Sequence, residues 1–403
     1  MEPKIRFKGF EDSWIGRKLT DVVSLYNGLT YTPNSIREKG TLVLRSSNVQ
    51  DGEITLNDNV YVESSVVNSP NVEKGDIIVV VRNGSRALIG KHAQIKNVMK
   101  DTVIGAFMAG MRSENPEFTN ALLGTPRFDY EVGINLGATI NQITNATFHS
   151  MSFGFPSNKE QKAIGKYFTS LDSQISASTS RLASLKQMKA ASLQAMFPQE
   201  GETVPKIRFK GFEGEWKTCP LYHFAKKRIE KNTKMLYNIT LTNSAEFGII
   251  DQRNFFDHEI SNSENINGYY VVRDHDFVYN PRISSSAPVG PINQNKLGYT
   301  GVMSPLYLVF EINGINRDFL EIFFHTTLWH KYMFDNGNTG ARFDRLAISD
   351  EDFMKMPIPD IDIEEQQAIA NYFTSLDRQI SLQSQRLEKL KQIKSACLDK
   401  MFV

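Results

Sequence analysis

The chain has 403 residues and a net charge of +1, because 46 lysines and arginines are balanced by 45 aspartates and glutamates. A hydrophobic content of 40% is enough for ordinary cores and excludes a disordered chain, and the balanced charge excludes a protein that holds nucleic acid by overall basicity alone. The sequence has no signal peptide, no apolar stretch of about 18 residues and no metal- or disulfide-type spacing of Cys219 and Cys397, so we expect a cytoplasmic protein.

A short lead opens the chain and returns about halfway along it. Residues 3–11 read Pro-Lys-Ile-Arg-Phe-Lys-Gly-Phe-Glu and are followed by Trp14, and residues 205–213 repeat them before Trp216, a shift of 202 residues (205 − 3 = 202). Apolar and basic residues alternate in the lead, which gives it one apolar edge and one basic edge. Two interpretations stay open: the lead docks a partner subunit, or it packs on its own domain and on the long helices described below.

The first variable segment is predicted to fold as an α+β domain with three polar loops. A strand that ends at Leu44 opens into the first loop, and a buried strand within 75–85 runs into the second. Residues 117–134 are expected to be helical, and the third loop lies within 135–142. The loops are rich in Arg, Asn, Ser, Thr and Gly, which hydrogen-bond base edges and phosphates but which polar turns also use for conformational reasons.

The second variable segment repeats these features with a different sequence. Residues 275–285 align with 75–85 at a shift of 200 residues (275 − 75 = 200), 318–335 are again expected to be helical, and 241–245 are again expected to be a strand end that opens into a polar loop. Because an arginine recurs at equivalent strand ends, base contact is favoured more for these two arginines than for the other loop residues. The identities that recur are Asp76 and Asp276, Arg82 and Arg282, Ser85 and Ser285, and Gly90 and Gly290.

Each half ends in a segment with the periodicity of a long amphipathic helix, expected over 157–197 and 362–402. The block Tyr-Phe-Thr-Ser-Leu-Asp at 167–172 returns at 372–377, a shift of 205 residues (372 − 167 = 205). Both predicted starts carry the spacing of a capping box, in which a Glu side chain reaches back to the backbone of the cap residue. These cap pairs are Ser157 with Glu160, and Asp362 with Glu365.

Apolar residues recur in both helical segments in steps of three and four, as in a coiled-coil seam. A helix of roughly 48 Å with so narrow a seam needs a partner helix. We therefore expect one antiparallel pair that acts as a spacer between two domains; the alternative is two separate helices, each packed on its own domain. Ser178 and Gln383 are matching polar seam positions, which commonly fix the register. The apolar seam residues are Ile164, Phe168, Leu171, Ile175, Leu182, Leu185, Met188 and Met196, and Ile369, Phe373, Leu376, Ile380, Leu387, Leu390, Ile393 and Met401.

The sequence lacks the common motifs of catalysis. It has no Walker loop, no Rossmann glycine fingerprint and no HExxH helix. Residues 280–283, Asn-Pro-Arg-Ile, resemble the Asn-Pro-Pro-aromatic motif of adenine methyltransferases, but Ile283 cannot stack on a flipped base. His325 and His330 have four residues between them, and the sequence offers no third metal ligand nearby. We predict no catalytic residue, no metal site and no cofactor in this chain.

The order of these features resembles the DNA-specificity (S) subunit of type I restriction–modification systems. The resemblance rests on the lead PKIRFKGFxxxW, a variable segment and a helix with EQxAIxxYFxSLDxQI, all present twice. It implies two pseudo-symmetric target-recognition domains with mixed β-sheets, each reading one half of a split, asymmetric site on double-stranded DNA. It also implies an antiparallel coiled coil that sets the spacing and docks two methyltransferase subunits, which bring S-adenosylmethionine. Restriction subunits that use ATP and Mg²⁺ are further partners implied by it.

On this basis we expect a first recognition domain over 1–155, a spacer helix over 156–198, a lead and second recognition domain over 199–358, and a second spacer helix over 359–403. A two-headed DNA-binding regulator and a protein–protein adaptor, both without a methyltransferase, are the alternatives. The DNA-contacting residues implied in the first domain are Arg45, Ser46, Ser47, Asn48, Arg82, Asn83, Ser85, Arg86, Thr139, Asn141 and Gln142. Those implied in the second are Thr242, Asn243, Arg282, Ser284, Ser285, Arg342 and Arg345.

Overall fold

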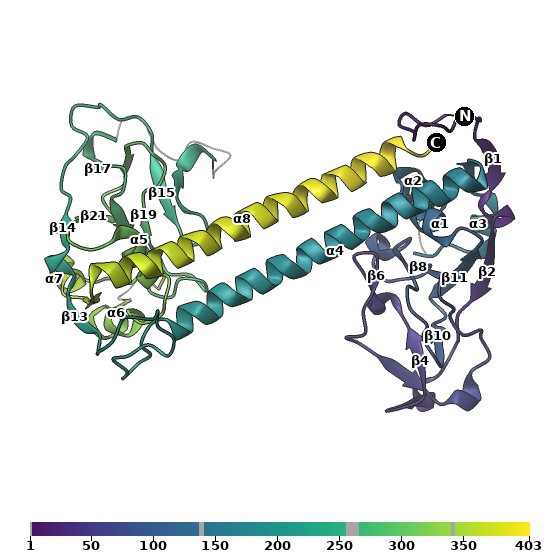
Figure 1. Cartoon of the computed structure of the whole chain (residues 1–403), viewed down its shortest axis with the longest axis horizontal. Coiled ribbons are helices and arrows are strands. Elements are labelled where there is room, and N and C mark those ends of the chain that lie inside the picture. The colour runs from purple at the N-terminus through teal and green to yellow at the C-terminus, as the bar shows by residue number, and fades with distance from the viewer. Residues whose placement is uncertain (1, 137–140, 255–265, 340–342) are drawn as a thin grey trace. The chain divides into compact units, whose positions relative to one another are not determined.

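The computed structural model describes the chain except for residues 1, 137–140, 255–265 and 340–342 (Figure 1). By its internal contacts the chain divides into two compact units, residues 1–180 with 384–403, and residues 181–383. Each unit holds one variable segment, part of each long helix and one lead. Within the described ranges, no helix is both long and apolar enough to cross a membrane.

Two four-stranded sheets form the scaffold of the variable segment in the first unit. One sheet has the order β2-β11-β8-β9 and is antiparallel throughout, and the other has the order β10-β4-β7-β3 with β10 and β4 parallel. The second of these sheets is therefore mixed, as expected, whereas the first is purely antiparallel. The strands are β1 (Ile15–Lys18), β2 (Val23–Asn27), β3 (Ile36–Arg37), β4 (Thr41–Leu44), β5 (Val49–Gln50), β6 (Glu53–Ile54), β7 (Val60–Val62), β8 (Ile77–Val80), β9 (His92–Gln94), β10 (Thr102–Ile104), β11 (Met108–Ser113) and β12 (Ser152–Phe155).

The helical stretch predicted over 117–134 is two helices, α1 (Pro116–Leu123) and α2 (Pro126–Asn135). The break falls at Thr125, whose hydroxyl accepts a 3.3 Å hydrogen bond from the Phe128 N–H and so caps α2. Pro126 stands in the first turn of α2, where its missing N–H costs no helical hydrogen bond. A third short helix, α3 (Asn145–Ser150), precedes β12.

The variable segment of the second unit repeats the antiparallel sheet with the order β14-β21-β18-β19. Its β18 corresponds to β8, which confirms the predicted alignment of the two buried strands. The predicted helix over 318–335 is again two helices. The elements are β13 (Lys217–Pro220), β14 (Ala225–Lys227), β15 (Leu241–Ser244), β16 (Gly248–Asp251), β17 (Tyr270–Val272), β18 (Phe277–Tyr279), β19 (Ile292–Gln294), β20 (Gly301–Met303), β21 (Leu308–Ile312), β22 (Pro357–Asp360), α5 (Arg317–Phe324), α6 (His330–Asn336) and α7 (Asp350–Met354).

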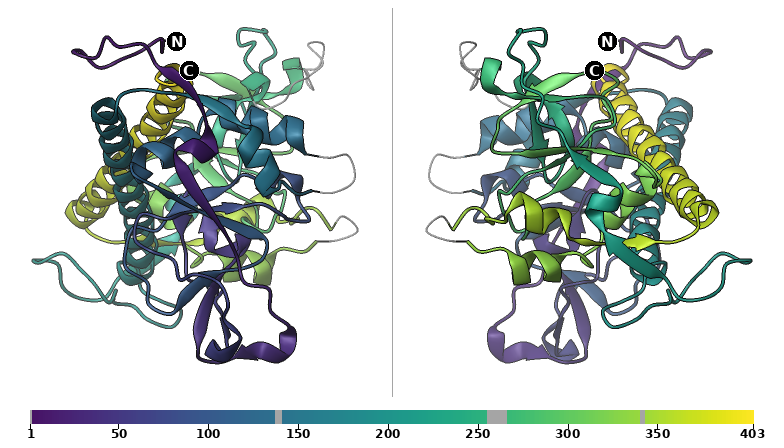
Figure 2. Two further views of the ribbon diagram at one scale, coloured as in Figure 1. Left: turned by 90° about the vertical axis from the view of Figure 1, so that its right-hand side faces the viewer. Right: turned by 90° about the vertical axis from the view of Figure 1, so that its left-hand side faces the viewer.

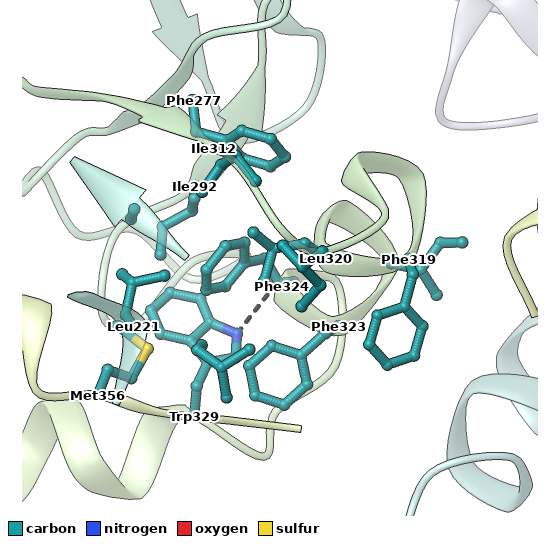
Figure 3. Packing of buried hydrophobic residues seen from close by; sticks show 14 of the residues in the cluster. Leu221, Phe277, Ile292, Ile312, Phe319, Leu320, Phe323, Phe324, Trp329 and Met356 are labelled. Carbon is teal, nitrogen blue, oxygen red and sulfur yellow. Dashed lines mark hydrogen bonds between the residues drawn. The ribbon is translucent and has the colours of Figure 1, made fainter. Parts of the chain in front are cut away.

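Aromatic side chains dominate the core of the second unit (Figure 3). Helix α5 turns one apolar face onto the sheet, and Phe277 and Phe310 stack at a ring distance of 5.7 Å. The indole of Trp329 packs edge-on against Phe324, and its N–H donates a 3.1 Å hydrogen bond to the Phe324 carbonyl. Burying such large rings supplies the main stabilisation of a domain of this size.

The two long helices are α4 (Asn158–Ala195) and α8 (Ile363–Lys400), close to the predicted bounds. In the first unit, Asp172 of α4 forms a 2.6 Å ion pair with Lys394 of α8, and the Tyr167 hydroxyl lies 3.4 Å from Cys397 Sγ. The contact partner in α8 therefore shifts from residue 394 to residue 397 as the position in α4 shifts from 172 back to 167. This opposite order shows that the helices are antiparallel.

The second unit contains the same contacts with the helices exchanged. Lys189 of α4 pairs with Asp377 of α8 at 2.6 Å, and the hydroxyls of Ser192 and Tyr372 lie 2.8 Å apart. Each residue stands 205 positions from its counterpart in the first unit (377 − 172 = 205). The helices therefore form the expected antiparallel pair and are not separate.

The seam of the helix pair differs from the sequence-based prediction at two positions. Met188 and Ile393 were assigned to the seam, but they are 50% and 38% exposed. A strict alternation of three- and four-residue steps from Leu185 and from Leu390 reaches Lys189 and Lys394 instead, both of which are partly buried. The apolar stems of these lysines pack in the seam while their ammonium groups reach the aspartates of the partner helix.

Candidate nucleic-acid interface

Three predicted loops of the first domain meet at one edge. The amide of Asn83 donates a 3.0 Å hydrogen bond to the Ser46 hydroxyl, 37 residues away in sequence. The amide of Asn141 donates a hydrogen bond of the same length to the carbonyl of Gly84. Side-chain amides can bond backbone groups of neighbouring loops in this way and fix their relative positions. The fold thus gathers polar groups from distant parts of the segment on one edge.

Arg82 stands two residues beyond the end of β8 and is exposed at this edge. Its backbone forms a β-bridge with Gln142, and its N–H donates a 3.2 Å hydrogen bond to the carbonyl of Phe107. The guanidinium carbon lies 5.0 Å from the centroid of the Phe107 ring, within the range of a cation–π contact. Arg82 therefore has a fixed backbone and a charged group directed over an aromatic ring.

Phe107 also lines a hollow of about 610 Å³, together with Arg45, Ser46 and Ser47. The guanidinium of Arg45 forms a 2.7 Å ion pair with Asp58, another residue of the hollow. The positive charge of Arg45 is thus offset locally.

The second domain brings two of its predicted loops together in the same way. The backbone of Arg282 forms a β-bridge with Arg345, as Arg82 does with Gln142. The Ile283 N–H donates a 3.0 Å hydrogen bond to the Asp344 carbonyl, and the Leu346 N–H donates one of 2.9 Å to the Pro281 carbonyl. The carboxylate of Asp344 lies 3.6 Å from the Arg282 guanidinium and 3.8 Å from that of Arg345. This edge therefore carries two arginines around one acid.

The duplicated aspartates anchor the starts of the strands that lead to these arginines. Asp76 accepts hydrogen bonds from the Tyr26 hydroxyl at 2.6 Å and from Arg112 Nε at 3.1 Å. Asp276 accepts two from Arg228, at 2.6 and 2.8 Å. Burial raises the pKa of Asp276, while the hydrogen bond from Arg228 acts against this rise. The aspartates recur because they hold a strand in place.

The first lead connects the two long helices within its unit. Nε and Nη2 of Arg6 both donate 2.8 Å hydrogen bonds to the carboxylate of Glu160, in the first turn of α4. The preceding Ile5 N–H donates a 2.9 Å hydrogen bond to the carbonyl of Lys400, the last residue of α8. Figure 2 (left) shows this lead beside the C-terminal end of α8. We call this pair of contacts the lead bridge.

The second unit has a lead bridge at equivalent positions. Arg208 donates hydrogen bonds of 2.6 and 2.7 Å to Glu365, and the Ile207 N–H donates one of 2.8 Å to the Ala195 carbonyl at the end of α4. The two glutamates, Glu160 and Glu365, are each only 1% exposed. Of the two interpretations of the lead, packing on the helix pair is what the structure shows.

Comparison with known proteins finds similarity to one family. The family model for the type I restriction modification DNA specificity domain matches residues 11–187. The specificity subunit of the type I restriction enzyme StySPI of Salmonella potsdam is 25% identical over 194 residues, and that of EcoKI of Escherichia coli (strain K12) is 25% identical over 197 residues. Residues 11–187 of the chain are therefore similar to the DNA specificity domain of type I restriction–modification systems.

Each curated match covers 46% of this chain and 42% of the relative, so the chain spans less than half the length of the curated relatives it matches. Among solved structures, the crystal structure of a type I restriction–modification S subunit from M. genitalium has a TM-score of 0.61 at 14% identity. That similarity covers 100% of this chain and 99% of the other. The specificity-subunit fold therefore extends over the whole chain.

Two asparagines predicted to contact DNA are buried in the structure and bond other protein groups. Asn48 is fully buried; its side chain accepts a hydrogen bond from the Arg45 N–H at 2.9 Å and donates one to the Thr55 carbonyl at 2.9 Å. Asn243 is 1% exposed and donates to the Val278 carbonyl at 2.7 Å. Both side chains satisfy buried backbone groups, so their amides do not face a base edge.

Thr242 and Asn243 also differ in secondary structure from the expectation. Residues 241–244 form strand β15, paired with β16, where the sequence suggested a strand end that opens into a loop. The Thr242 hydroxyl lies 3.3 Å from that of Tyr307. A β-branched residue suits a strand, and this pairing explains why the resemblance to 44–48 was misleading.

The remaining predicted residues are divided between exposed and turn-forming positions. Ser85, Arg86 and Ser285 are exposed. The Ser284 hydroxyl accepts a 3.1 Å hydrogen bond from the Ala287 N–H and so stabilises its own turn. Two further predicted residues, Thr139 and Arg342, lie outside the described residues.

The capping box predicted at the start of α4 is only half formed, and at the start of α8 the Glu365 N–H donates a 3.0 Å hydrogen bond to the backbone carbonyl of Asp362. The Glu160 N–H donates a 3.4 Å hydrogen bond to the Ser157 hydroxyl, as predicted. The carboxylate of Glu160, however, bonds Arg6 and not the cap backbone, and that of Glu365 bonds Arg208. A charged donor forms a stronger hydrogen bond with a carboxylate than a backbone N–H does, which accounts for the choice.

Sequence reasoning missed the exposed aromatic residues and the acid at the two edges. Phe107 is 53% exposed beside Arg82, and Phe343 is 84% exposed next to Asp344. An aromatic residue in the turn before a strand has no distinguishing sequence pattern, although its exposure in a folded domain is uncommon. Across the described ranges, no cluster of three or more His, Cys, Asp or Glu side chains could hold a metal ion.

Proposed function

We propose that this chain is the DNA-recognition subunit of a type I restriction–modification complex and directs that complex to an asymmetric, bipartite site. Each variable domain would read one half-site through its loop edge. The observation that carries the proposal is the equivalent placement of Arg82 and Arg282, each bridged at the backbone to a second polar segment. A duplicated frame with unlike edges suits a target whose two halves differ in sequence.

The chemistry of the edges fits the reading of base pairs in the major groove. The planar guanidinium group can bond O6 and N7 of guanine together, and amides such as Asn141 and Gln142 can pair with adenine. Neighbouring hydroxyl and backbone groups would contact phosphates and position the domain. We assign no catalytic step to this chain, and methyl transfer would belong to partner subunits.

The helix pair would set the distance between the half-sites and dock two methyltransferase subunits that carry S-adenosylmethionine. Two observations support this role: the helices are antiparallel, and each lead bridge ties the start of one helix to the end of the other. Restriction subunits that use ATP and Mg²⁺ would be further partners in the cytoplasm. A net charge of +1 suits a protein that holds DNA jointly with such partners.

We propose a division into recognition domains over residues 1–155 and 199–358 and spacer helices over 156–198 and 359–403. Co-expression with the neighbouring methyltransferase, followed by methylation-sensitive sequencing of host DNA, tests the function. We expect methylation at one two-part motif with unread bases between the parts, and none with the methyltransferase alone. Tight, specific DNA binding by the isolated chain without methylation would favour a regulator, and absence of any DNA preference would favour an adaptor.

A further inference from the structure

The two duplicated arginines have equivalent backbones and different side-chain surroundings. Both follow the corresponding strands of the four-stranded sheets, and both form a β-bridge to the segment that closes the edge. At Arg82 the Val81 and Arg82 N–H groups both donate to the carbonyl of Phe107, at 2.9 and 3.2 Å. The Phe107 backbone and ring thus both contact the arginine, the ring at 5.0 Å from its guanidinium carbon.

The Arg82 guanidinium keeps its own donors available. Among the described residues it forms no ion pair, and no protein group accepts a hydrogen bond from its side chain. An aromatic ring attracts a guanidinium through its π face and leaves the N–H groups in the plane of the cation free to bond elsewhere. The contact therefore restricts the orientation of the arginine without occupying the atoms that would read a base.

The second domain has no such arrangement at the equivalent place. Tyr307 stands 200 positions after Phe107 (307 − 107 = 200), but its hydroxyl lies 3.3 Å from that of Thr242. Arg282 instead lies 3.6 Å from the carboxylate of Asp344, and in the described part of the chain it has no aromatic ring beneath it. A carboxylate at that position would repel a phosphate and compete for the donors of the arginine.

We propose that Phe107 is a positioning residue for Arg82, which it orients as a two-donor group for a guanine in the first half-site. The inference rests on the proposed function and adds to it which residue sets the specificity of one base pair. Recognition of guanine O6 and N7 needs both donors of the guanidinium in one plane at a set angle. The contact with the Phe107 ring supplies that restriction before DNA binds, as preorganised binding groups generally do.

The test uses the whole complex with its methyltransferase and measures methylation rates on the target and on targets with each base pair replaced. Arg82→Ala should lower discrimination at one base pair of one half-site roughly 5-fold to 150-fold. Phe107→Leu, which keeps apolar bulk but removes the π face, should lower discrimination at that same base pair about 2-fold to 5-fold. Phe107→Tyr should preserve it, and Tyr307→Phe in the second domain should leave this base pair unaffected.

The double variant separates positioning from a general structural effect. If Phe107 acts through Arg82, the pair Arg82→Ala and Phe107→Leu should discriminate no worse than Arg82→Ala alone. Because Phe107 is half-exposed, Phe107→Leu should unfold at nearly the same urea concentration as the parent, and Phe107→Ala provides a second variant that removes the ring.

The outcomes distinguish this inference from the proposed function. If the parent complex shows no sequence preference, the proposed function fails and this inference with it. If the parent is specific and Arg82→Ala relaxes one base pair, but Phe107→Leu and Phe107→Ala do not, only the positioning role is overturned. If Arg82→Ala lowers the methylation rate equally on every DNA, Arg82 contacts phosphate rather than a base. That result would also overturn the positioning role of Phe107.

Discussion

Arg208 donates hydrogen bonds of 2.6 and 2.7 Å to the two carboxylate oxygens of Glu365, in a two-pronged ion pair that closes the lead onto the start of helix α8. The hydrogen bond with Glu365 raises the pKa of Arg208, so the guanidinium stays charged throughout the ordinary pH range. The first unit repeats this relationship between Arg6 and Glu160. The lead is thus part of the structure that joins the helices, and its letter-for-letter repetition has a physical cause.

Removal of the arginine should leave a buried carboxylate without its partner. We expect Arg208→Ala to lower the free energy of unfolding by about 2–3 kcal/mol, less than for a fully dry pair because the Arg208 side chain is partly exposed. Urea denaturation of the full chain measures this. Lys331→Ala, which breaks the exposed pair with Glu200, is the matched control and should change the free energy of unfolding far less.

The matching double variant tests the cause of that loss. Arg208→Ala combined with Glu365→Ala should be more stable than Arg208→Ala alone, since the unpaired buried charge is then gone. A double variant that is even less stable would show that lost packing, and not the carboxylate, explains the effect.

The duplicated glycines should respond unequally to substitution. Gly90 and Gly290 have positive φ angles of 86° and 83°, a conformation that costs a residue with a side chain about 1–2 kcal/mol. A Cβ at Gly290 would stand 2.0 Å from the carbonyl oxygen of Asn280, whereas at Gly90 the nearest atom is a Val132 methyl at 3.3 Å. Gly90→Ala should therefore cost about 1–2 kcal/mol and Gly290→Ala about 3–5 kcal/mol in urea denaturation. Equal losses would contradict the close approach at Gly290.

Stability should fall as the pH is lowered, in part because of His92. Its ring lies 3.1 Å from the carbonyls of both Gly90 and Asn120, and burial lowers its pKa below the usual value. The unfolded chain then binds more protons than the folded chain between that lowered pKa and about 6.5, so stability is full above this range and is lost as the pH falls through it.

Urea midpoints measured from about pH 7.5 to about pH 5.5 test this sign. We expect the midpoint to decrease toward acid and His92→Gln to weaken that dependence. His149→Gln, at an exposed histidine, is the control and should keep the slope of the parent. A parent midpoint that rises toward acid, or a His92→Gln slope equal to that of the parent, would be inconsistent with a buried neutral imidazole.

Methylation by the complex should depend on the number of base pairs between the two half-sites and not on their sequence. Insertion of one base pair rotates one half-site by about 34° and shifts it by about 3.4 Å, which a stiff helix pair cannot follow. Methylation by the complex should drop on DNA with one base pair added or removed. DNA with other bases in a gap of unchanged length is the control and should be methylated as before. Undiminished methylation of the lengthened gap would argue against a rigid spacer.

The apolar periodicity predicted the helix pair but not every residue of its seam. The repeat, the helix bounds and the antiparallel pairing followed from the sequence, because a heptad spacing over so many turns leaves few alternatives. The same reasoning placed Met188 and Ile393 in the seam, since it chose positions by apolar character. The structure places Lys189 and Lys394 there, because long side chains can bury their stems and still pair their charges.

The candidate site was predictable as a set of loops but not residue by residue. Arg82 and Arg282 were singled out because a repeated arginine at a strand end has no structural need to recur; the structure places them equivalently, and their contact with DNA stays a prediction. Asn48 and Asn243 were indistinguishable from them in sequence, because amides satisfy buried backbone groups as readily as base edges. The glutamates of the predicted capping boxes bond arginines more than 150 residues away, and local spacing carries no information on such contacts.

A domain exchange tests most directly whether each variable domain reads its own half-site: residues 15–155 are replaced with the corresponding segment of a type I specificity subunit whose target is known. DNA methylated by the chimeric complex is then sequenced. We expect one half of the recognised motif to change to that of the donor, while the other half and the gap length stay as in the parent. A chimera that alters both halves, or that methylates the parental motif unchanged, would contradict the claim that each variable domain reads its own half-site.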